Sequence, residues 1–439
     1  MTHLSPAREL SAQTIDPMYE WARDLFPVCR SITGAGTRAT LAYIRERLPG
    51  LRIESIASGA KAFDWTVPDE WNIRDAALFD EAGRRLIDFR ASNLHVVGYS
   101  EPVDLWLDLE ALQPHLYSLP EQPDAIPYIT SYYKRRWGFC LTDRQRRALK
   151  PGRYRAMIDS SLAPGVLSYG ECILPGASSR EVLLSSYVCH PSMGNNELSG
   201  PVVTLAIARW LASLPERRYS YRIVFIPETI GSIVYLSRNL ETMRKRTVAG
   251  FVVTCAGDER AYSFMPSRTG ETLADRVALH VMRQLPEGFK RYSFLERGSD
   301  ERQYCSPLAD LPVASIMRSK YGTYPEYHTS LDDLSLITQA GLEGSFRVLR
   351  DCLTVLEANR HWRAVVPCEP QLGPRGLYPT LSTRESGLQV RDMMNLLAYA
   401  DGKSDLLQIA ETIGVPALRV AEIAKTLAAA SLLEDVSPA

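Results

Sequence analysis

The segment Glu181-Val-Leu-Leu-Ser-Ser-Tyr-Val-Cys-His190-Pro-Ser-Met-Gly-Asn-Asn-Glu197-Leu-Ser-Gly-Pro201 joins a short apolar run to a polar loop. The run at 181–186 predicts a buried strand, and the apolar residues at 201–214 predict the helix that follows. The loop between them carries His190 and Glu197. A rigid strand-to-helix loop can present such side chains as metal ligands, or they can simply satisfy the loop backbone.

The same alternation of strand and helix continues over residues 170–365. Further strands are predicted at 221–226, 250–255 and 311–316, and helices near 231–245, 272–285 and 337–358. This alternation predicts an α/β domain with a mostly parallel central sheet. Because active sites in such sheets gather at the carboxyl ends of the strands, side chains that follow the strands are the candidates for chemistry.

Four further candidates lie after predicted strands or at helix entrances: Glu228, Asp258, Asp300 and His328. Each has a structural alternative, and Glu228, for example, could only complement the dipole of the helix that follows it. Taken together, they converge on one sheet edge. One or two histidines with several carboxylates are the donors that a zinc hydrolase uses.

Two other regions of the chain have a different pattern of apolar and polar residues. Residues 53–164 contain short apolar runs between prolines and acidic turns, and this predicts an inserted β-rich domain. The α/β domain is therefore predicted to be discontinuous, with residues 1–52 and 165–370. Residues 376–439 contain three short helical patterns, which suit a winged helix.

The overall composition excludes several classes of protein. Of 439 residues, 45% are hydrophobic and 23% are charged, as in an ordinary globular protein. Lys and Arg number 50 and Asp and Glu 51, so no field of one sign favours a general polyanion or membrane binder. No run of about 20 apolar residues predicts a membrane span. The absence of a secretory signal pattern and of any CxxC pair among the eight cysteines favours a cytoplasmic protein with free thiols.

The C-terminal region argues against a nucleic-acid partner. Residues 376–439 hold five basic and eight acidic residues, too few cations to neutralise several phosphates. We therefore expect this region to pack against the α/β domain or a second subunit. A DNA-binding regulator with a ligand-sensing α/β domain is the alternative that the winged-helix pattern leaves open.

The order of these clusters resembles the zinc aminopeptidases, which use two co-catalytic metals to remove N-terminal residues. Nearly the whole chain is similar to a bacterial family of aminopeptidase-like proteins with an inserted β domain and a C-terminal winged helix. The motifs that carry this likeness are Cys29-Arg-Ser-Ile-Thr-Gly34, Phe63-Asp-Trp-Thr-Val-Pro-Asp-Glu-Trp-Asn-Ile73, Ile126-Pro-Tyr-Ile-Thr-Ser-Tyr-Tyr133, Trp137-Gly-Phe-Cys140, Cys189-His-Pro-Ser192 and Tyr327-His-Thr-Ser330. The resemblance implies a zinc-aminopeptidase-like α/β/α sandwich with both additional domains.

Some aminopeptidase site residues have counterparts here. The resemblance implies that His328, with Asp332 four residues later, is the last metal ligand. It implies that Glu228 is the general base, and that Asp258 approximates the acid that follows the next strand.

Other positions depart from the aminopeptidase pattern. Tyr187 and Cys189 stand where the first histidine and its aspartate are expected, Asn196 stands at the bridging aspartate, and Thr229 at the second glutamate. We infer that His190 and Glu197 substitute for the lost ligands. These departures favour one zinc ion over two.

The leading hypothesis is a zinc-dependent hydrolase of the aminopeptidase type, which cleaves an amide beside a free amino group in a small-molecule or peptide-like substrate. His190 and His328, with Glu197, Asp258 or both, are predicted to bind zinc. Glu228 is predicted to activate water. Asp300 and Arg30 are predicted to lie near the substrate.

The alternative is a catalytically lapsed aminopeptidase fold that binds an amino-acid-like or sugar-linked ligand in a biosynthetic pathway. In either case we expect no nucleic-acid or membrane partner, and a homo-oligomer is possible.

Overall fold

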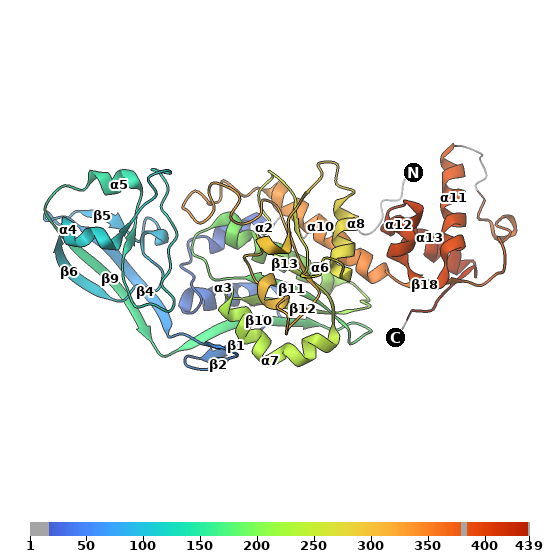
Figure 1. The fold of residues 1–439 in the computed structure, drawn as a ribbon, viewed down its shortest axis with the longest axis horizontal. Coiled ribbons are helices and arrows are strands. Elements are labelled where there is room, and N and C mark those ends of the chain that lie inside the picture. Colours follow the sequence, from blue (N-terminus) through green and yellow to red (C-terminus); the bar gives the residue numbers. More distant parts are fainter. Residues whose placement is uncertain (1–16, 379–383, 438–439) are drawn as a thin grey trace.

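The computed structural model describes residues 17–378 and 384–437. The molecule is elongated and has three parts in a row: a β-rich module, a central α/β domain and a helical C-terminal part (Figure 1). The N-terminal helices and the segment that follows the module both belong to the central domain, so the module interrupts it in sequence.

An eight-stranded mixed sheet forms the centre of the α/β domain. In spatial order its strands are β1 (Arg52–Ala57), β10 (Val166–Leu174), β12 (Ser220–Ile226), β11 (Glu181–Tyr187), β13 (Thr247–Val253), β16 (Val313–Met317), β14 (Ser263–Met265) and β15 (Lys290–Arg291). The four strands from β12 to β16 are parallel. Every residue of β11 and β12 is buried, because helices cover both faces of the sheet.

Helices form a layer on each side of this sheet. One layer contains α2 (Pro17–Leu25), α3 (Ala35–Arg47), α6 (Ser199–Ser213), α8 (Leu273–Met282) and α10 (Gln339–Ala358). The other contains α7 (Ile230–Arg246) and the short α9 (Glu301–Tyr304). The predicted α/β/α sandwich is therefore confirmed.

The β-rich module has its own core and its own four-stranded antiparallel sheet. The order is β5 (Arg85–Asp88), β4 (Glu70–Phe79), β9 (Arg153–Ala163) and β6 (Val103–Asp108), with short pieces β7 (Leu116–Tyr117), β8 (Phe139–Cys140), α4 (Leu109–Leu112) and α5 (Asp143–Ala148) around it. A hairpin of β2 (Lys61–Ala62) and β3 (Trp65–Thr66) lies near α7, where the module joins the central domain (Figure 1). The predicted domain boundary at residue 53 falls inside β1, which pairs with β10 in the large sheet.

The C-terminal part is a winged helix. It consists of β17 (His361–Ala364), α11 (Arg384–Tyr399), β18 (Asp401–Asp405), α12 (Leu406–Ile413), α13 (Ala417–Ala429) and β19 (Leu433–Asp435), with the sheet order β18-β17-β19. It packs on α8 and α10, where Arg276 binds both carboxylate oxygens of Asp405 at 2.9 Å and Ala417 N donates to His280 Nε2 at 2.9 Å. Within the described residues, no helix combines the length and apolar character that crossing a membrane requires.

Candidate active site

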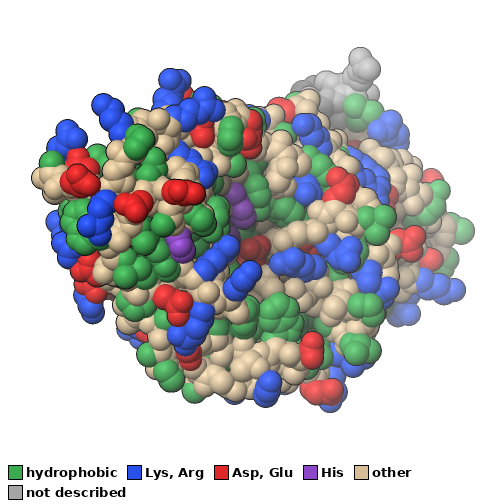
Figure 2. Space-filling model, turned by 60° about the vertical axis from the view of Figure 1, so that its left-hand side comes forward, with side chains coloured by type: hydrophobic (Ala, Val, Ile, Leu, Met, Phe, Trp, Pro, Cys, Tyr) green, Lys and Arg blue, Asp and Glu red, His purple; other side chains and the backbone are tan. Residues whose placement is uncertain are grey.

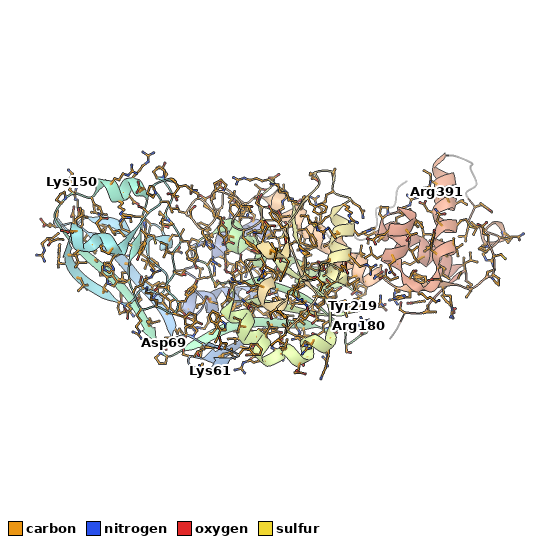
Figure 3. The ribbon with its side chains drawn as sticks, in the orientation of Figure 1. Lys61, Asp69, Lys150, Arg180, Tyr219 and Arg391 are labelled. Atoms are coloured by element: carbon orange, nitrogen blue, oxygen red, sulfur yellow. The ribbon has the colours of Figure 1, made fainter. Side chains whose placement is uncertain are left out.

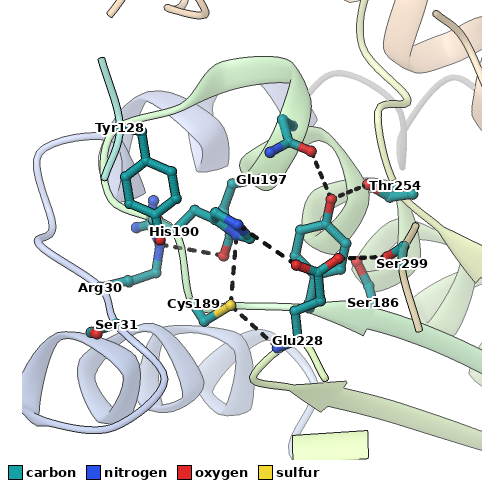
Figure 4. A network of polar contacts seen from close by, with 12 residues as sticks. Arg30, Ser31, Tyr128, Ser186, Cys189, His190, Glu197, Glu228, Thr254 and Ser299 are labelled. Atoms are coloured by element: carbon teal, nitrogen blue, oxygen red, sulfur yellow. Dashed lines mark hydrogen bonds and ion pairs between the residues drawn. The ribbon is translucent and has the colours of Figure 1, made fainter. Parts of the chain in front are cut away.

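Loops at the carboxyl ends of the parallel strands bring most of the predicted site residues together. His190 follows β11, Glu228 follows β12, and Asp300 precedes α9. The close-up in Figure 4 shows His190 between Glu197 and Glu228, with the Tyr128 ring beside it. On the molecular surface, histidine side chains are visible in a hollow whose lower rim carries Lys and Arg side chains (Figure 2).

His190 has a different carboxylate on each side of its ring. Its Nδ1 is hydrogen bonded to Glu197 Oε2 at 2.8 Å, and its Nε2 lies 3.7 Å from Glu228 Oε2. Burial, assisted by the nearby Arg30, lowers the pKa of His190 to about 3, so the imidazole is neutral. When Nδ1 donates to the Glu197 carboxylate, Nε2 keeps its lone pair, and this is the tautomer that metal binding needs.

Arg30 supports the His190 loop from inside the protein. Its side chain is fully buried, its Nε donates to His190 O at 2.9 Å, and its Nη1 donates to Leu25 O at 2.7 Å. The Nε atom also lies 3.6 Å from Glu197 Oε1. Burial raises the pKa of Glu197 to about 8 despite this cation. The structure therefore places Arg30 behind Glu197, where it fixes the loop.

Glu228 and Asp300 form a second acidic group. Ser299 Oγ donates to Glu228 Oε1 at 2.8 Å, and Thr229 N and Ser232 Oγ each donate to Asp300 Oδ1 at 2.8 Å. Burial raises the pKa of both carboxyl groups, and for Glu228 the negative charge of Asp300 adds to the shift. The second oxygen of Asp300 is buried without a hydrogen-bond partner.

His328 enters the site from a separate loop. Its backbone is left-handed, with φ 57°, and its ring stacks on Tyr327 with centroids 3.9 Å apart. The His190 and His328 ring centroids are 5.5 Å apart. Burial and the neighbouring His190 lower the pKa of His328 to about 3, and its Nε2 is buried without a partner. An unpartnered nitrogen of this kind is expected where a ligand binds.

Tyr128, from the inserted module, is a site residue that the sequence did not reveal. Its ring centroid is 5.2 Å from both histidine rings, and its backbone N donates to His328 O at 2.8 Å. Its hydroxyl bonds the Tyr132 hydroxyl at 2.9 Å. The motif from Ile126 to Tyr133 was distinctive in sequence, but nothing in it indicated proximity to either histidine.

Asp258 does not join the two histidines. Its carboxylate accepts from Ser319 N, Ser319 Oγ, Arg260 N and Asn195 Nδ2, each at 2.9 Å. With four donors around its two oxygens, this carboxylate holds neighbouring loops together. Asp332 acts similarly, since it accepts from the backbone N of Asn195 at 2.6 Å and of Asn196 at 2.9 Å.

Two of the positions that depart from the aminopeptidase pattern, Tyr187 and Asn196, belong to a neutral network. Tyr187 hydroxyl donates to Asn196 Oδ1 at 2.8 Å and lies 2.5 Å from Thr254 Oγ1. Cys255 Sγ also contacts Asn196 Oδ1, at 3.5 Å. Burial raises the pKa of the Tyr187 hydroxyl well above its ordinary value, so this group stays protonated. The network presents no anionic ligand for a second metal.

Among the described residues, Cys189, His190 and Glu197 place their ligand atoms within 4.8 Å of one another. This cluster surrounds the Nδ1 side of His190, where Arg30 already supplies a positive charge and Cys189 Sγ accepts from Glu228 N at 3.2 Å. Burial raises the pKa of the Cys189 thiol well above its ordinary value. A cation is therefore better accommodated on the Nε2 side, toward Glu228.

Comparison with known proteins places these features in a family. A family model described as "Domain of unknown function (DUF4910)" matches residues 19–359, and a winged helix-turn-helix model matches residues 360–435. A Clostridium acetobutylicum protein described as "Putative polysaccharide biosynthesis protein with aminopeptidase-like domain" is 42% identical over 428 residues, which cover 97% of this chain and 98% of that one.

Solved structures show the same relationships. The crystal structure of a "putative peptidase" from Clostridium acetobutylicum superposes with a TM-score of 0.92 at 41% identity and covers 98% of both chains. A zinc aminopeptidase from Bacillus subtilis superposes with a TM-score of 0.57 at 12% identity, over 78% of this chain and 94% of that one. At 12% identity, the likeness to the Bacillus subtilis aminopeptidase shows a shared fold alone.

Proposed function

The chain belongs to the DUF4910 family, and on this premise we propose that it is a hydrolase with a single zinc ion, which cleaves an amide beside a free amino group. The observation that carries the proposal is the pair of neutral imidazoles, His190 and His328, with ring centroids 5.5 Å apart and Glu228 Oε2 3.7 Å from His190 Nε2. The aminopeptidase-like fold supports the reaction class, because its relatives of known fold include zinc aminopeptidases.

The chemistry of three donors, His190, His328 and Glu228, suits one zinc ion, and their side chains would have to draw together around it, since the described residues bring only Cys189, His190 and Glu197 within 4.8 Å of one another. His190 and His328 would hold it through Nε2, and the Glu228 carboxylate would be the third donor. Two histidines and one glutamate are a typical set for catalytic zinc, which leaves a position for water or substrate. Bound there, zinc would supply Lewis-acid polarisation of a carbonyl group. The unpartnered, buried Nε2 of His328 is the atom that such an ion would satisfy.

Three further side chains have roles in this proposal. Glu197 orients the His190 ring through Nδ1, as carboxylates commonly do for metal-bound histidines. Tyr128 closes the site on the side of the inserted module. Asp300 takes a proton from the attacking water at Oδ2, because its raised pKa suits a proton acceptor near neutral pH. The proton-accepting role expected of Glu228 thus passes to Asp300.

The cellular setting is also a proposal. All eight cysteines are free thiols, and six of them are buried, which fits a reducing cytoplasm. The excess of acidic residues in the C-terminal region supports a winged helix that makes no nucleic-acid contact.

A second candidate function is ligand binding without hydrolysis. The neutral contacts among Tyr187, Asn196 and Thr254 favour it, since they stand where aminopeptidases hold half of their metal site. The name of the Clostridium relative, with its reference to polysaccharide biosynthesis, suggests a sugar-linked ligand.

Metal analysis combined with activity assays separates the two candidates. We expect about one zinc per chain and turnover of aminoacyl anilides that chelation abolishes and zinc restores. Asp300→Asn should retain zinc and lose turnover, and His361→Ala, a histidine of the winged helix, should change neither. Protein that binds ligand but shows no turnover at any zinc loading would support the second candidate and contradict hydrolysis.

A further inference from the structure

A small hairpin at the junction of the module and the α/β domain exposes two aromatic side chains. The hairpin pairs β2 with β3, and Figure 3 labels Lys61 on it and Asp69 nearby, at the lower edge of the molecule. Phe63 and Trp65 are 59% and 40% exposed. Phe63 also has a left-handed backbone, with φ 53°. A bulky residue with a left-handed backbone is strained, and strain without compensating burial suggests a function at that position.

A third exposed ring comes from the motif that also supplies Tyr128. Tyr133 is 55% exposed, and its ring lies edge-on to Trp65 with centroids 5.6 Å apart. Its hydroxyl donates to Thr66 O at 3.1 Å. Two motifs that the sequence marked as distinctive therefore meet at the contact of Trp65 with Tyr133. These two exposed rings, with the exposed Phe63 on the same hairpin, are called the aromatic ledge.

A cavity of about 330 Å³ adjoins the ledge at Tyr133, the ledge residue that belongs to its lining. Its polar lining includes Thr66, Asp69, Ser131, Lys134 and Arg135. Arg135 lies 3.7 Å from an Asp69 oxygen, whereas no carboxylate of the described residues lies within ion-pair distance of the exposed Lys134. The cavity thus combines aromatic surface with donors and acceptors of both charges, and its size falls within the range of small-ligand pockets.

We propose that the ledge and this cavity form a saccharide-binding site. A sugar ring presents an apolar face of C–H groups, which packs on aromatic rings, and a rim of hydroxyls, which bond charged and amide groups. The ledge exposes only roughly 300 Å² of aromatic surface, whereas a stable protein interface needs about 800 Å² per partner. Charges of both signs at the cavity make it unlike the basic surfaces that anionic membranes attract.

The saccharide site shares a wall with the candidate active site. Tyr132 lines the cavity, and its hydroxyl bonds that of Tyr128, whose ring is 5.2 Å from the His190 ring. A sugar in the cavity would therefore be one tyrosine pair away from the histidines. The further conclusion that the substrate is sugar-linked rests on the proposed function, but saccharide binding at the ledge does not.

Tryptophan fluorescence and calorimetric titration of the full chain test the site. The probes are a panel of free hexoses, N-acetylhexosamines and hexuronic acids, at concentrations up to tens of millimolar. We expect saturable binding of at least one probe, with a loss of tenfold or more in Trp65→Ala and Tyr133→Ala. Trp106→Ala is the matched control, because Trp106 is 46% exposed on the same module. The titrations are run with and without zinc, so their outcome does not depend on hydrolysis.

A Phe63→Gly variant separates function from stability. Glycine relieves the left-handed strain, so the thermal midpoint should stay unchanged or rise while saccharide affinity falls. Absence of binding to every probe, or equal affinity in the wild type and the ledge variants, would overturn the site. So would loss of a wild-type dimer in the ledge variants, or Trp65-dependent sedimentation with phosphatidylserine vesicles.

Discussion

The two sides of the sheet edge at His190 differ in chemistry although the same loops form both. On one side, His190, Glu228 and His328 present two neutral imidazoles and a carboxylate, and His328 Nε2 has no partner. On the other, Tyr187 and Asn196 are bonded to each other, and the free Nδ2 of Asn196 is a donor that cannot bind a cation. The unsatisfied atom on the first side is an imidazole nitrogen, which can bind a metal ion, whereas the unsatisfied atom on the second side is an N–H donor, which cannot. The difference supports the proposal of a single metal position at this sheet edge.

The largest expected effect follows from removal of a metal ligand. His190→Ala and His328→Ala should each weaken binding of Co²⁺, used as a spectroscopic substitute for zinc, by more than about 100-fold. Loss of a group that only orients a ligand already costs about 10–100-fold, and a direct ligand contributes more. Absorbance titration measures the affinity, with His361→Ala as the control. Unchanged affinity in either variant would place the metal elsewhere.

A smaller loss is expected for the orienting carboxylate. Glu197→Gln should weaken Co²⁺ binding by about 10–100-fold, because the His190 ring keeps a hydrogen bond but an amide oxygen replaces a carboxyl group that can become a carboxylate when the metal binds. The sequence alone predicted a direct ligand at this position. A loss as large as that of His328→Ala, with an altered visible spectrum, would favour the direct-ligand role.

A substitution in the neutral group around Tyr187 and Asn196 should change the stability of the protein but not its metal binding. Tyr187→Phe leaves Asn196 Oδ1 with fewer donors in a buried place, and this should lower the free energy of unfolding by about 1–3 kcal/mol. Urea denaturation measures the change, and metal affinity and stoichiometry should match those of the wild type. A change of stoichiometry would show that the two sides are not independent.

The extent to which sequence predicted this site depends on the range of the contacts. Strand periodicity and the position after each strand predicted where Glu228 and His190 lie, just beyond β12 and β11, because those signals are local. Tyr128 could not be found in this way, since its contact with His328 joins segments 200 residues apart. The pairing of Glu197 with Nδ1, and the four donors around Asp258, are details of orientation that composition and spacing do not encode.

The smallest expected effect concerns the contact between the α/β domain and the winged helix. His280 Nε2 accepts from Ala417 N, and burial lowers the pKa of His280, so folding favours the neutral form. The stability it contributes is present above the unfolded pKa of about 6.5 and is lost as pH falls below it. Between pH 7.5 and 5, wild type should lose up to about 1 kcal/mol relative to His280→Gln, whose amide does not titrate. Urea denaturation measures the free energy of unfolding at each pH. An equal loss between pH 7.5 and 5 in the two proteins would contradict this expectation.

The number and position of bound metal ions test the single-metal site most directly. Zinc-loaded crystals, measured at the zinc absorption edge, should show one anomalous peak per chain. Its position should mark an ion held by His190 Nε2, His328 Nε2 and Glu228. Two peaks, with the second beside Tyr187 and Asn196, would contradict the distinction between the two sides. No peak in zinc-saturated crystals would contradict the metal site itself.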